Sequence, residues 1–260
     1  KVILGGGGLI HDRGGRYVLG GYIIPVLLGK LFGKPLIVLC IGADPPFKSG
    51  VNQSIVKHVM NMADHISVRD ELTKDFLQKI GVTNEINVVG DPALCLSLQS
   101  LTGIPFSVIT DVNEHVIGVN LREWSADTRK LSRELVSLLD VYLDNRSRIV
   151  FLCSPMDINF VRQIINAEKV RFDYEIVDCV SMRPSYILKL IQGFEFIFSM
   201  RLHFLIDAVI TNVPCIGLPY LDKVKCFCDL FKIPMLSSAD ISKRDLQSLM
   251  DQNMSRLPYR

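Results

Sequence analysis

Residues 194–223 read FEFIFSMRLHFLIDAVITNVPCIGLPYLDK, and the hydrophobic pattern changes its period twice along them. The apolar run from Phe194 to Phe198 predicts a short buried strand. Ser199 carries N-cap chemistry for a helix whose apolar residues recur three and four positions apart, at Leu202, Leu205, Ile206, Val209 and Ile210. The segment PCIGLPY, residues 214–220, then returns as a second strand. Alternating strands and helices predict an α/β fold with a parallel sheet.

Cationic and titratable residues gather at both of these strand ends. Arg201 and His203 flank Leu202 at the start of the helix, and Lys223 follows the second strand. The unpaired N–H groups of a first helical turn favour anions, and open α/β sheets bind ligands beyond the carboxyl ends of their strands. Together the residues predict an anion-binding pocket. Taken singly, each is equally well explained as a solvated charge or a structural histidine.

The same alternation of strands and helices runs through the whole sequence. Up to Pro92 it repeats about four times, and it restarts at Val116 after a polar stretch. We predict two Rossmann-like domains facing a cleft, residues 1–105 and 106–260, with helices on both faces of each sheet. Because residue 1 already starts a core strand, we expect the first domain to lack a preceding β-α unit. Further helices are expected over residues 22–32, 51–62, 71–79, 128–143, 158–168, 185–190, 225–231 and 242–250.

Composition limits the class of protein and of partner. The chain has 260 residues, of which 48% are hydrophobic and 22% charged, and its net charge is +2. This length suits two domains of about 100 to 150 residues. The scattered basic residues form no block that would bind nucleic acid, so no nucleic-acid partner is expected. An anionic small molecule would have to be held by local cations.

The seven cysteines include no CxxC pair, which predicts reduced, mostly buried thiols in a cytoplasmic protein. Cys226 and Cys228 lack histidines at ligand spacing, so no metal site is expected. Every long apolar stretch is interrupted before the roughly 18 to 20 residues of a membrane span. Contact with the inner face of a membrane and assembly into a homo-oligomer stay open.

A glycine run follows the first predicted strand. Gly6, Gly7 and Gly8 lie within it, and successive N–H groups of such a loop can form an anion-binding nest. The run fits neither G-x-G-x-x-G nor a P-loop, so we interpret it as a substrate loop at a strand end, with close backbone packing as the alternative. Asp12 and Asp91 also end strands and are candidates for contacting an acceptor, with a turn role as the alternative.

Four segments resemble the polysaccharide pyruvyl transferases in order and spacing. They are GGGGLIHD (5–12), SVRDELTKDFLQKIGV (67–82), VVGDPAL (88–94) and SMRLHFLIDAVITNVPCIGLPYLDKV (199–224). The resemblance extends from residue 3 to about residue 232, and its most specific part is Arg-Leu-His with the downstream Tyr-x-x-Lys. It implies a fold similar to the two-domain, GT-B type glycosyltransferases. It also implies transfer of the enolpyruvyl group of phosphoenolpyruvate to a saccharide of the cell envelope or an exopolysaccharide, as a pyruvate ketal.

The resemblance also implies roles for individual residues. Arg69, His203 and Lys223 would contact phosphoenolpyruvate, with Arg201 and Leu202 adjoining. An Arg fork suits phosphate or carboxylate, and Lys supplies a compact charge. His203 would protonate the methylene carbon or deprotonate the attacking hydroxyl, because histidine changes its charge near neutral pH. No cofactor or metal is implied, and the acceptor could be lipid- or nucleotide-linked.

Two other functions remain open at this stage. A nucleotide-sugar-dependent glycosyltransferase would use the same two-domain architecture. A non-catalytic sugar-phosphate binding module would use the same cations only to hold an anion.

Overall fold

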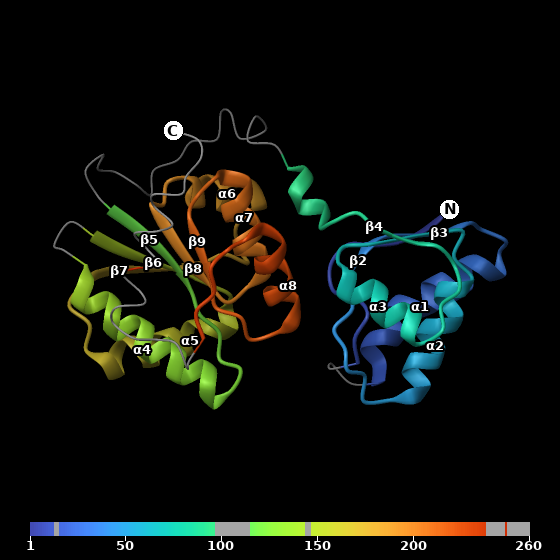
Figure 1. Cartoon of the computed structure of the whole chain (residues 1–260), viewed down its shortest axis with the longest axis horizontal. Coiled ribbons are helices and arrows are strands. Elements are labelled where there is room, and N and C mark those ends of the chain that lie inside the picture. The colour runs from blue at the N-terminus through green and yellow to red at the C-terminus, as the bar shows by residue number, and fades with distance from the viewer. Residues whose placement is uncertain (13–15, 97–114, 144–146, 238–247, 249–260) are drawn as a thin grey trace. The chain divides into compact units, whose positions relative to one another are not determined.

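The computed structural model describes residues 1–12, 16–96, 115–143, 147–237 and 248. The chain divides into two compact units, Lys1–Cys95 and Leu96–Arg260. The predicted boundary between residues 105 and 106 lies outside the described residues, as does the predicted helix over 242–250 except for residue 248. Each unit is built on one parallel sheet with alternating helices, so the predicted α/β, Rossmann-like fold class is confirmed (Figure 1).

The first unit contains a four-stranded parallel sheet in the order β1-β2-β3-β4. Its strands and helices are β1 (Val2–Gly5), α1 (Arg16–Leu31), β2 (Leu36–Ile41), α2 (Gly50–Asn61), β3 (His65–Val68), α3 (Glu71–Lys79), β4 (Ile86–Val88) and the 3-10 turn η1 (Pro92–Cys95). Because the strand order follows the chain, right-handed crossovers place all three α-helices on one face (Figure 1). The prediction of helices on both faces is therefore wrong for the described part of this unit.

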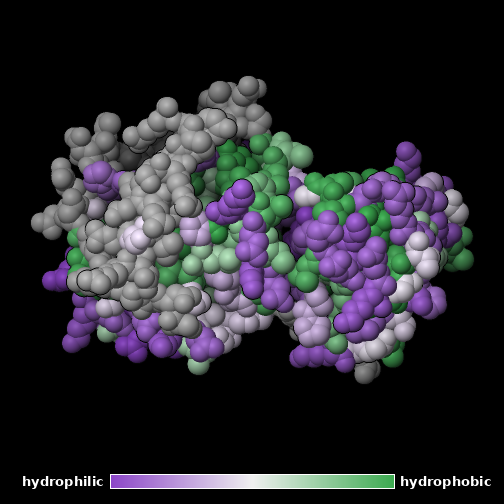
Figure 2. Space-filling view, in the orientation of Figure 1, coloured by the Kyte–Doolittle hydropathy of each residue, from purple (hydrophilic) through white to green (hydrophobic). Residues whose placement is uncertain are grey.

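The other face of this sheet exposes apolar side chains. Ile3 is 61% exposed, Leu39 45% and Val88 36%, although all three lie in strands. Figure 2 shows green, hydrophobic patches among purple, hydrophilic side chains on the surface of this unit. The buried core accordingly lies between the sheet and the three helices, around Leu36, Val38, Val56, Ile66 and Leu77.

The second unit contains a five-stranded parallel sheet in the order β7-β6-β5-β8-β9. Its elements are β5 (His115–Asn120), α4 (Ala126–Tyr142), β6 (Ser147–Cys153), α5 (Pro155–Glu168), β7 (Asp173–Asp178), α6 (Pro184–Gln192), β8 (Phe196–Ser199), α7 (Leu202–Thr211), β9 (Cys215–Gly217) and α8 (Asp222–Phe231). Helices α4 and α5 pack together on one face and α6 and α7 on the other (Figure 1). The chain reverses its direction across the sheet between β5 and β8, and this switch point is where such sheets bind ligands.

Strand β8 forms the centre of the second core. Phe196 and Phe198 are fully buried, with ring centroids 5.0 Å apart. Gly118 on β5 leaves room for Phe194, because a Cβ at residue 118 would lie 2.6 Å from the Phe194 ring. Burying one such aromatic side chain contributes about 1.5–3 kcal/mol, so the apolar run that predicted this strand also stabilises the unit.

Several helix boundaries differ from the sequence predictions. Helix α1 starts at residue 16 rather than 22, although Pro25 lies inside it. Pro25 has no N–H to donate to the carbonyl of Gly21, so the helix continues through it without that bond. Helix α8 starts at Asp222 rather than Lys225, which places Lys223 in a first helical turn and not at a strand end.

Ser199 was predicted to be an N-cap, and that prediction is wrong. Ser199 is the last residue of β8, and Arg201 is the N-cap of α7, without a capping side-chain hydrogen bond. The Ser199 hydroxyl instead donates to the carbonyl of Arg201 at 2.9 Å. The hydroxyl therefore shapes the two-residue turn between strand and helix.

The longest apolar helix of the first unit, α1, has 16 residues. Among the helices of the described residues, none combines the length and the hydrophobicity that crossing a membrane requires.

Candidate functional site

The turn from β8 to α7 is fixed by a buried asparagine. Asn120, the last residue of β5, is fully buried, and its Oδ1 accepts a hydrogen bond from the Arg201 backbone N–H at 3.0 Å. Its Nδ2 donates to the carbonyl of Leu152 on β6 at 2.6 Å. One side chain thus connects the carboxyl ends of three neighbouring strands. This network fixes the backbone from which Arg201 and the residues after it project.

The side chain of Arg201 reaches back to the first turn of α5. Its Nε lies 3.2 Å from Oδ2 of Asp157, its Nη2 also donates to that oxygen, and Nη2 lies 2.9 Å from the hydroxyl of Ser154. Ser154 in turn donates to Asp157 at 2.7 Å. The side chain of Asp157 is 5% exposed and that of Arg201 25%. Arg201 is therefore oriented by a largely buried carboxylate, and Nη1 takes part in none of these bonds.

The other predicted donor-binding residues of this unit lie at the same sheet edge. His203 is the second residue of α7 and is exposed, whereas Leu202 beside it is buried. Lys223 is the second residue of α8 and is half-buried. Because β8 and β9 pair in parallel, α7 and α8 both begin at the carboxyl edge of the sheet. Arg201, His203 and Lys223 thus follow two adjacent strands, Lys223 from within a first helical turn, and their convergence on one pocket stays a prediction.

Arg69 lies in the first unit, immediately after β3, and its side chain is only 3% exposed. Its Nε donates to Oδ2 of Asp70 at 3.0 Å, and its Nη1 lies 3.7 Å from Oδ2 of Asp91. Among the described residues, its buried Nη2 has no hydrogen-bond partner. An unsatisfied buried donor is costly, so an acceptor that reached this nitrogen would be bound favourably.

Two neighbours determine the position of Arg69. Asp70 is the N-cap of α3, and its Oδ1 accepts from the backbone N–H of Thr73 at 2.8 Å. Gly42, after β2, lies directly against the guanidinium, since a Cβ at this position would be 2.4 Å from Nε and 2.6 Å from Nη2. Glycine at residue 42 therefore leaves the space that the guanidinium of Arg69 occupies.

The glycine loop after β1 requires glycine for its backbone conformation. Gly6 and Gly7 have φ of +78° and +69°, and a Cβ at either would meet nothing within 4 Å. Close packing, the alternative explanation of the run, therefore does not apply to these two residues; Gly8, next in the loop, is half-buried. The proposed role as a substrate loop stays a prediction.

Asp12 and Asp91 each use one carboxylate oxygen to shape the backbone. Oδ2 of Asp12 accepts from the N–H groups of Lys48 and Ser49 at 2.7 and 3.0 Å. Oδ1 of Asp91 accepts from the N–H of Ala93 at 3.1 Å. The alternative of a turn role is thus observed for Asp91, whereas Asp12 holds a distant part of the backbone. Contact with an acceptor stays a prediction for both.

The residues that position Arg201 were not found from the sequence. Asn120 lies at the end of a strand that its apolar residues predict, and Asp157 follows Ser154 at the spacing of an N-terminal helix cap. That Ser-Pro-x-Asp pattern is a signal of a helix start, and the structure adds that its carboxylate also binds an arginine from another strand end.

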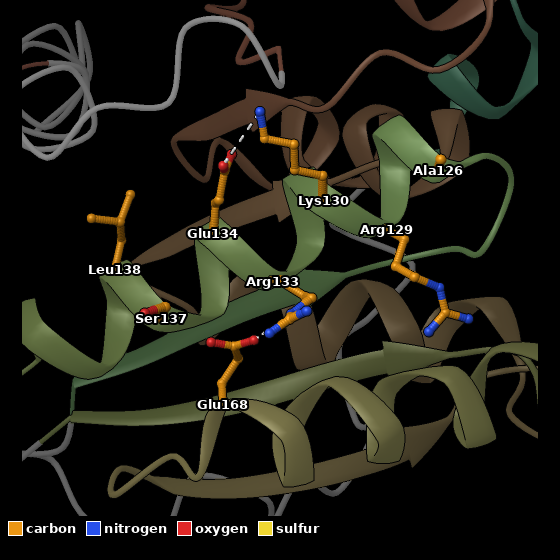
Figure 3. Close-up of a pocket in the computed structure, with 8 residues that line it drawn as sticks. All are labelled: Ala126, Arg129, Lys130, Arg133, Glu134, Ser137, Leu138 and Glu168. Carbon is orange, nitrogen blue, oxygen red and sulfur yellow. Dashed lines mark hydrogen bonds and ion pairs between the residues drawn. The ribbon is translucent and has the colours of Figure 1, made fainter.

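A cavity of about 620 Å³ lies along α4 and the end of α5 (Figure 3). Its charged side chains pair with one another: Arg133 Nε lies 2.5 Å from Glu168 Oε1, and Lys130 Nζ 3.8 Å from Glu134 Oε1. Because the cations already have carboxylate partners, this cavity is a weaker candidate for binding an anion than the strand ends.

Four cysteines of the second unit are buried thiols. Burial raises the pKa of Cys153, Cys179, Cys215 and Cys228 to about 12, so these thiols stay protonated at neutral pH. Among the described residues, no three His, Cys, Asp or Glu side chains gather in a way that could hold a metal ion. The chemistry available at the strand ends is that of cations, an imidazole and backbone N–H groups.

The two sheets with alternating helices define a GT-B type, two-domain Rossmann-like protein. Solved structures with this fold include UDP-GlcNAc 2-epimerase from Methanocaldococcus jannaschii (TM-score 0.63, 15% identity, 90% of this chain and 67% of that one) and from Neisseria meningitidis (0.60, 13%, 90% and 65%). They also include MurG from Acinetobacter baumannii (0.52, 14%, 94% and 65%). The chain spans about two thirds of the length of these proteins, and at such identities the likeness concerns the fold alone.

A comparison with curated proteins found no match. The model of the polysaccharide pyruvyl transferase family, however, matches residues 1–222, which include every strand-end residue described above except Lys223. The chain belongs to the polysaccharide pyruvyl transferase family.

Proposed function

We propose that this chain transfers the enolpyruvyl carbons of phosphoenolpyruvate to a saccharide and forms a cyclic pyruvate ketal. The observation that carries the proposal is the junction of β8 and α7, where Arg201, Leu202 and His203 lie within the matched family region at the carboxyl edge of the sheet. A cation and an imidazole beside a first helical turn suit a donor that has both a phosphate and a carboxylate.

The donor would be held by the cations. Lys223 starts the neighbouring helix, and the buried guanidinium of Arg69 has a nitrogen that no described residue satisfies. An Arg fork binds carboxylate or phosphate through parallel hydrogen bonds. Because these side chains would neutralise the donor, we propose that the reaction needs neither a metal nor another cofactor.

The proposed reaction balances with one donor and two acceptor hydroxyls. A proton added to the methylene carbon of phosphoenolpyruvate makes it a methyl group and leaves an oxocarbenium-like centre at the adjacent carbon. One saccharide hydroxyl attacks that centre, inorganic phosphate leaves, and a second hydroxyl closes the ketal. His203, exposed in the first turn of α7, is the proposed group that gives or takes one of these protons.

We place this reaction in the cytoplasm, because all seven cysteines are free thiols and thiols persist in reducing compartments. The saccharide acceptor would belong to an envelope polymer or exopolysaccharide and be carried by a lipid or a nucleotide.

A nucleotide-sugar glycosyltransferase is the second candidate, since fold relatives have been solved with UDP-GlcNAc or UDP bound. The two functions differ in the ligand that stabilises the folded protein. A ligand binding only the native state raises the melting temperature, increasingly so as its concentration exceeds Kd. We expect phosphoenolpyruvate to raise the Tm of the chain, and UDP and GDP to leave it unchanged.

The stabilisation experiment has a matched pair of variants. Lys223→Ala removes a proposed donor contact, whereas Lys79→Ala removes a lysine from the last turn of α3. The proposal predicts that only Lys223→Ala weakens the response to phosphoenolpyruvate. A Tm that responds to UDP and not to phosphoenolpyruvate would replace it with the glycosyltransferase function.

A further inference from the structure

A second cavity of about 400 Å³ lies in the second unit, between the segment after β5 and the segment after β9. Both segments follow carboxyl ends of the same parallel sheet, next to the switch point between β5 and β8. The volume falls within the roughly 300–1,000 Å³ of typical small-molecule sites. None of the residues to which a role has been assigned above lines it. Its lining includes Trp124, Asp127, Leu131, Tyr220, Asp222 and Lys225.

Aromatic side chains form one wall of this cavity. The rings of Trp124 and Tyr220 meet edge to face with centroids 5.4 Å apart. The guanidinium of Arg122 lies 5.1 Å from the Trp124 ring and 5.7 Å from the Tyr220 ring, and its Nη1 donates to the Tyr220 hydroxyl at 3.1 Å. Trp124 is nevertheless 45% exposed.

The backbone that carries Trp124 is fixed before any ligand arrives. Ser125 and Thr128 form a capping box at the start of α4, and the backbone N–H of Trp124 donates to Oγ1 of Thr128 at 3.1 Å. The backbone N–H of Arg122 donates to the sulfur of Met200 at 3.1 Å, which ties the segment to the end of β8. An aromatic platform held in this way loses little conformational entropy on binding.

We propose that this cavity is a subsite for a neutral pyranose ring of the saccharide acceptor, an inference that rests on the proposed function and places an acceptor contact in the second unit. The C–H face of a pyranose is apolar and packs on an indole or phenol ring, while its hydroxyls need acceptors and donors at the edge. Asp127, Asp222 and Lys225 supply those groups around the aromatic wall.

The charges of the cavity favour a neutral ring over an anion. The cavity is lined by the carboxylates of Asp127 and Asp222 and by the ammonium group of Lys225. No ion pair among the described residues uses either carboxylate. A phosphate group would meet both carboxylates there, whereas hydroxyl groups donate hydrogen bonds to carboxylates. A nucleotide diphosphate is therefore a poorer fit to this cavity than a saccharide.

Trp124 is the only tryptophan in the chain, so its fluorescence reports directly on this cavity. The experiment titrates the full chain with the methyl glycosides of galactose, glucose, mannose, N-acetylglucosamine and N-acetylmannosamine, and separately with UDP. We expect at least one glycoside to change the emission saturably with a roughly millimolar Kd. Saturation by UDP alone, or no saturable change with any glycoside, would overturn the proposal.

Four variants separate binding in the cavity from a general effect on folding. Asp127→Asn and Tyr220→Ala are expected to raise the glycoside Kd at least about tenfold, and Tyr186→Ala, an exposed tyrosine on α6, to leave it unchanged. Tyr220→Phe keeps the ring and should lose less affinity than Tyr220→Ala. Equal affinity in all four variants would place the glycoside elsewhere and contradict the subsite.

The Tm response to phosphoenolpyruvate, measured on the same samples, distinguishes the two proposals. Glycoside binding without any response to phosphoenolpyruvate leaves the subsite standing and removes the proposed function. A response to phosphoenolpyruvate without glycoside binding removes only the subsite.

Discussion

Arg201 and Asp157 come from strand ends two positions apart in the second sheet, yet Nε and Nη2 of the arginine both donate to one oxygen of the aspartate. The most specific motif of the sequence is thus anchored by a residue outside it. The contact links the first turn of α5 to the junction from which Leu202 and His203 project. The geometry of the proposed donor site therefore depends on a carboxylate that does not belong to the motif.

Replacing Asp157 should destabilise the second unit. Asp157→Ala leaves the guanidinium of Arg201 without its buried counter-ion. Removing one partner of a buried ion pair costs about 3–5 kcal/mol. We expect a smaller loss here, because the side chain of Arg201 is a quarter exposed. Urea unfolding of the full chain measures the change. Glu123→Ala, which removes the exposed partner of Arg129, is the control and should cost less than about 1 kcal/mol. Equal urea midpoints for Asp157→Ala and Glu123→Ala would show that the ion pair of Arg201 and Asp157 does not stabilise the unit.

Gly42→Ala tests whether the position of Arg69 matters for the donor. The added Cβ would lie 2.4 Å from Arg69 Nε, so the guanidinium has to move. We expect the variant to lose most of the Tm response to phosphoenolpyruvate. Gly50→Ala is the matched control, because a Cβ there meets nothing within 4 Å. An unchanged response in Gly42→Ala would remove Arg69 from the donor site.

The buried thiols predict a pH dependence of reactivity and stability. The raised pKa of Cys153, Cys179, Cys215 and Cys228 means that the folded state binds protons more tightly than the unfolded state, whose thiols titrate near 9.0. Their contribution to stability is therefore complete below pH 9 and is lost as the pH rises towards about 12. The free energy of unfolding, measured by urea titration over this range, should fall.

The same thiols should resist a thiol reagent in the folded state. At pH 8 we expect the exposed Cys95 to react first and these four to react only after unfolding. Mass spectrometry after brief labelling identifies the modified residues. Labelling of Cys153 as fast as Cys95 would contradict the burial on which this prediction depends.

Much of the second unit could be predicted because its signals are local. The apolar run before Ser199 and the helical spacing from Leu202 onward depend only on neighbouring residues, and both elements occur where expected. The position of Lys223 was less predictable, because α8 begins without a side-chain cap that a sequence would reveal.

The contacts that orient the candidate site could not be predicted, because they join residues far apart in the chain. The bond from Asn120 to Leu152, the pairing of Arg201 with Asp157 and the place of Arg69 against Gly42 all depend on strand order. The expected helices on both faces of the first sheet also required the strand order, since only a reversal of direction moves a helix to the other face.

The central claim is that His203 takes part in pyruvyl transfer from phosphoenolpyruvate. The most direct measurement is phosphate release from phosphoenolpyruvate with a saccharide acceptor, by the wild type, by His203→Ala and by His58→Ala, an exposed histidine on α2. Loss of a general acid or base costs about 10²–10⁴-fold in rate, so His203→Ala should fall by that factor while His58→Ala keeps the wild-type rate. Equal phosphate release by the wild type and His203→Ala would contradict the claim.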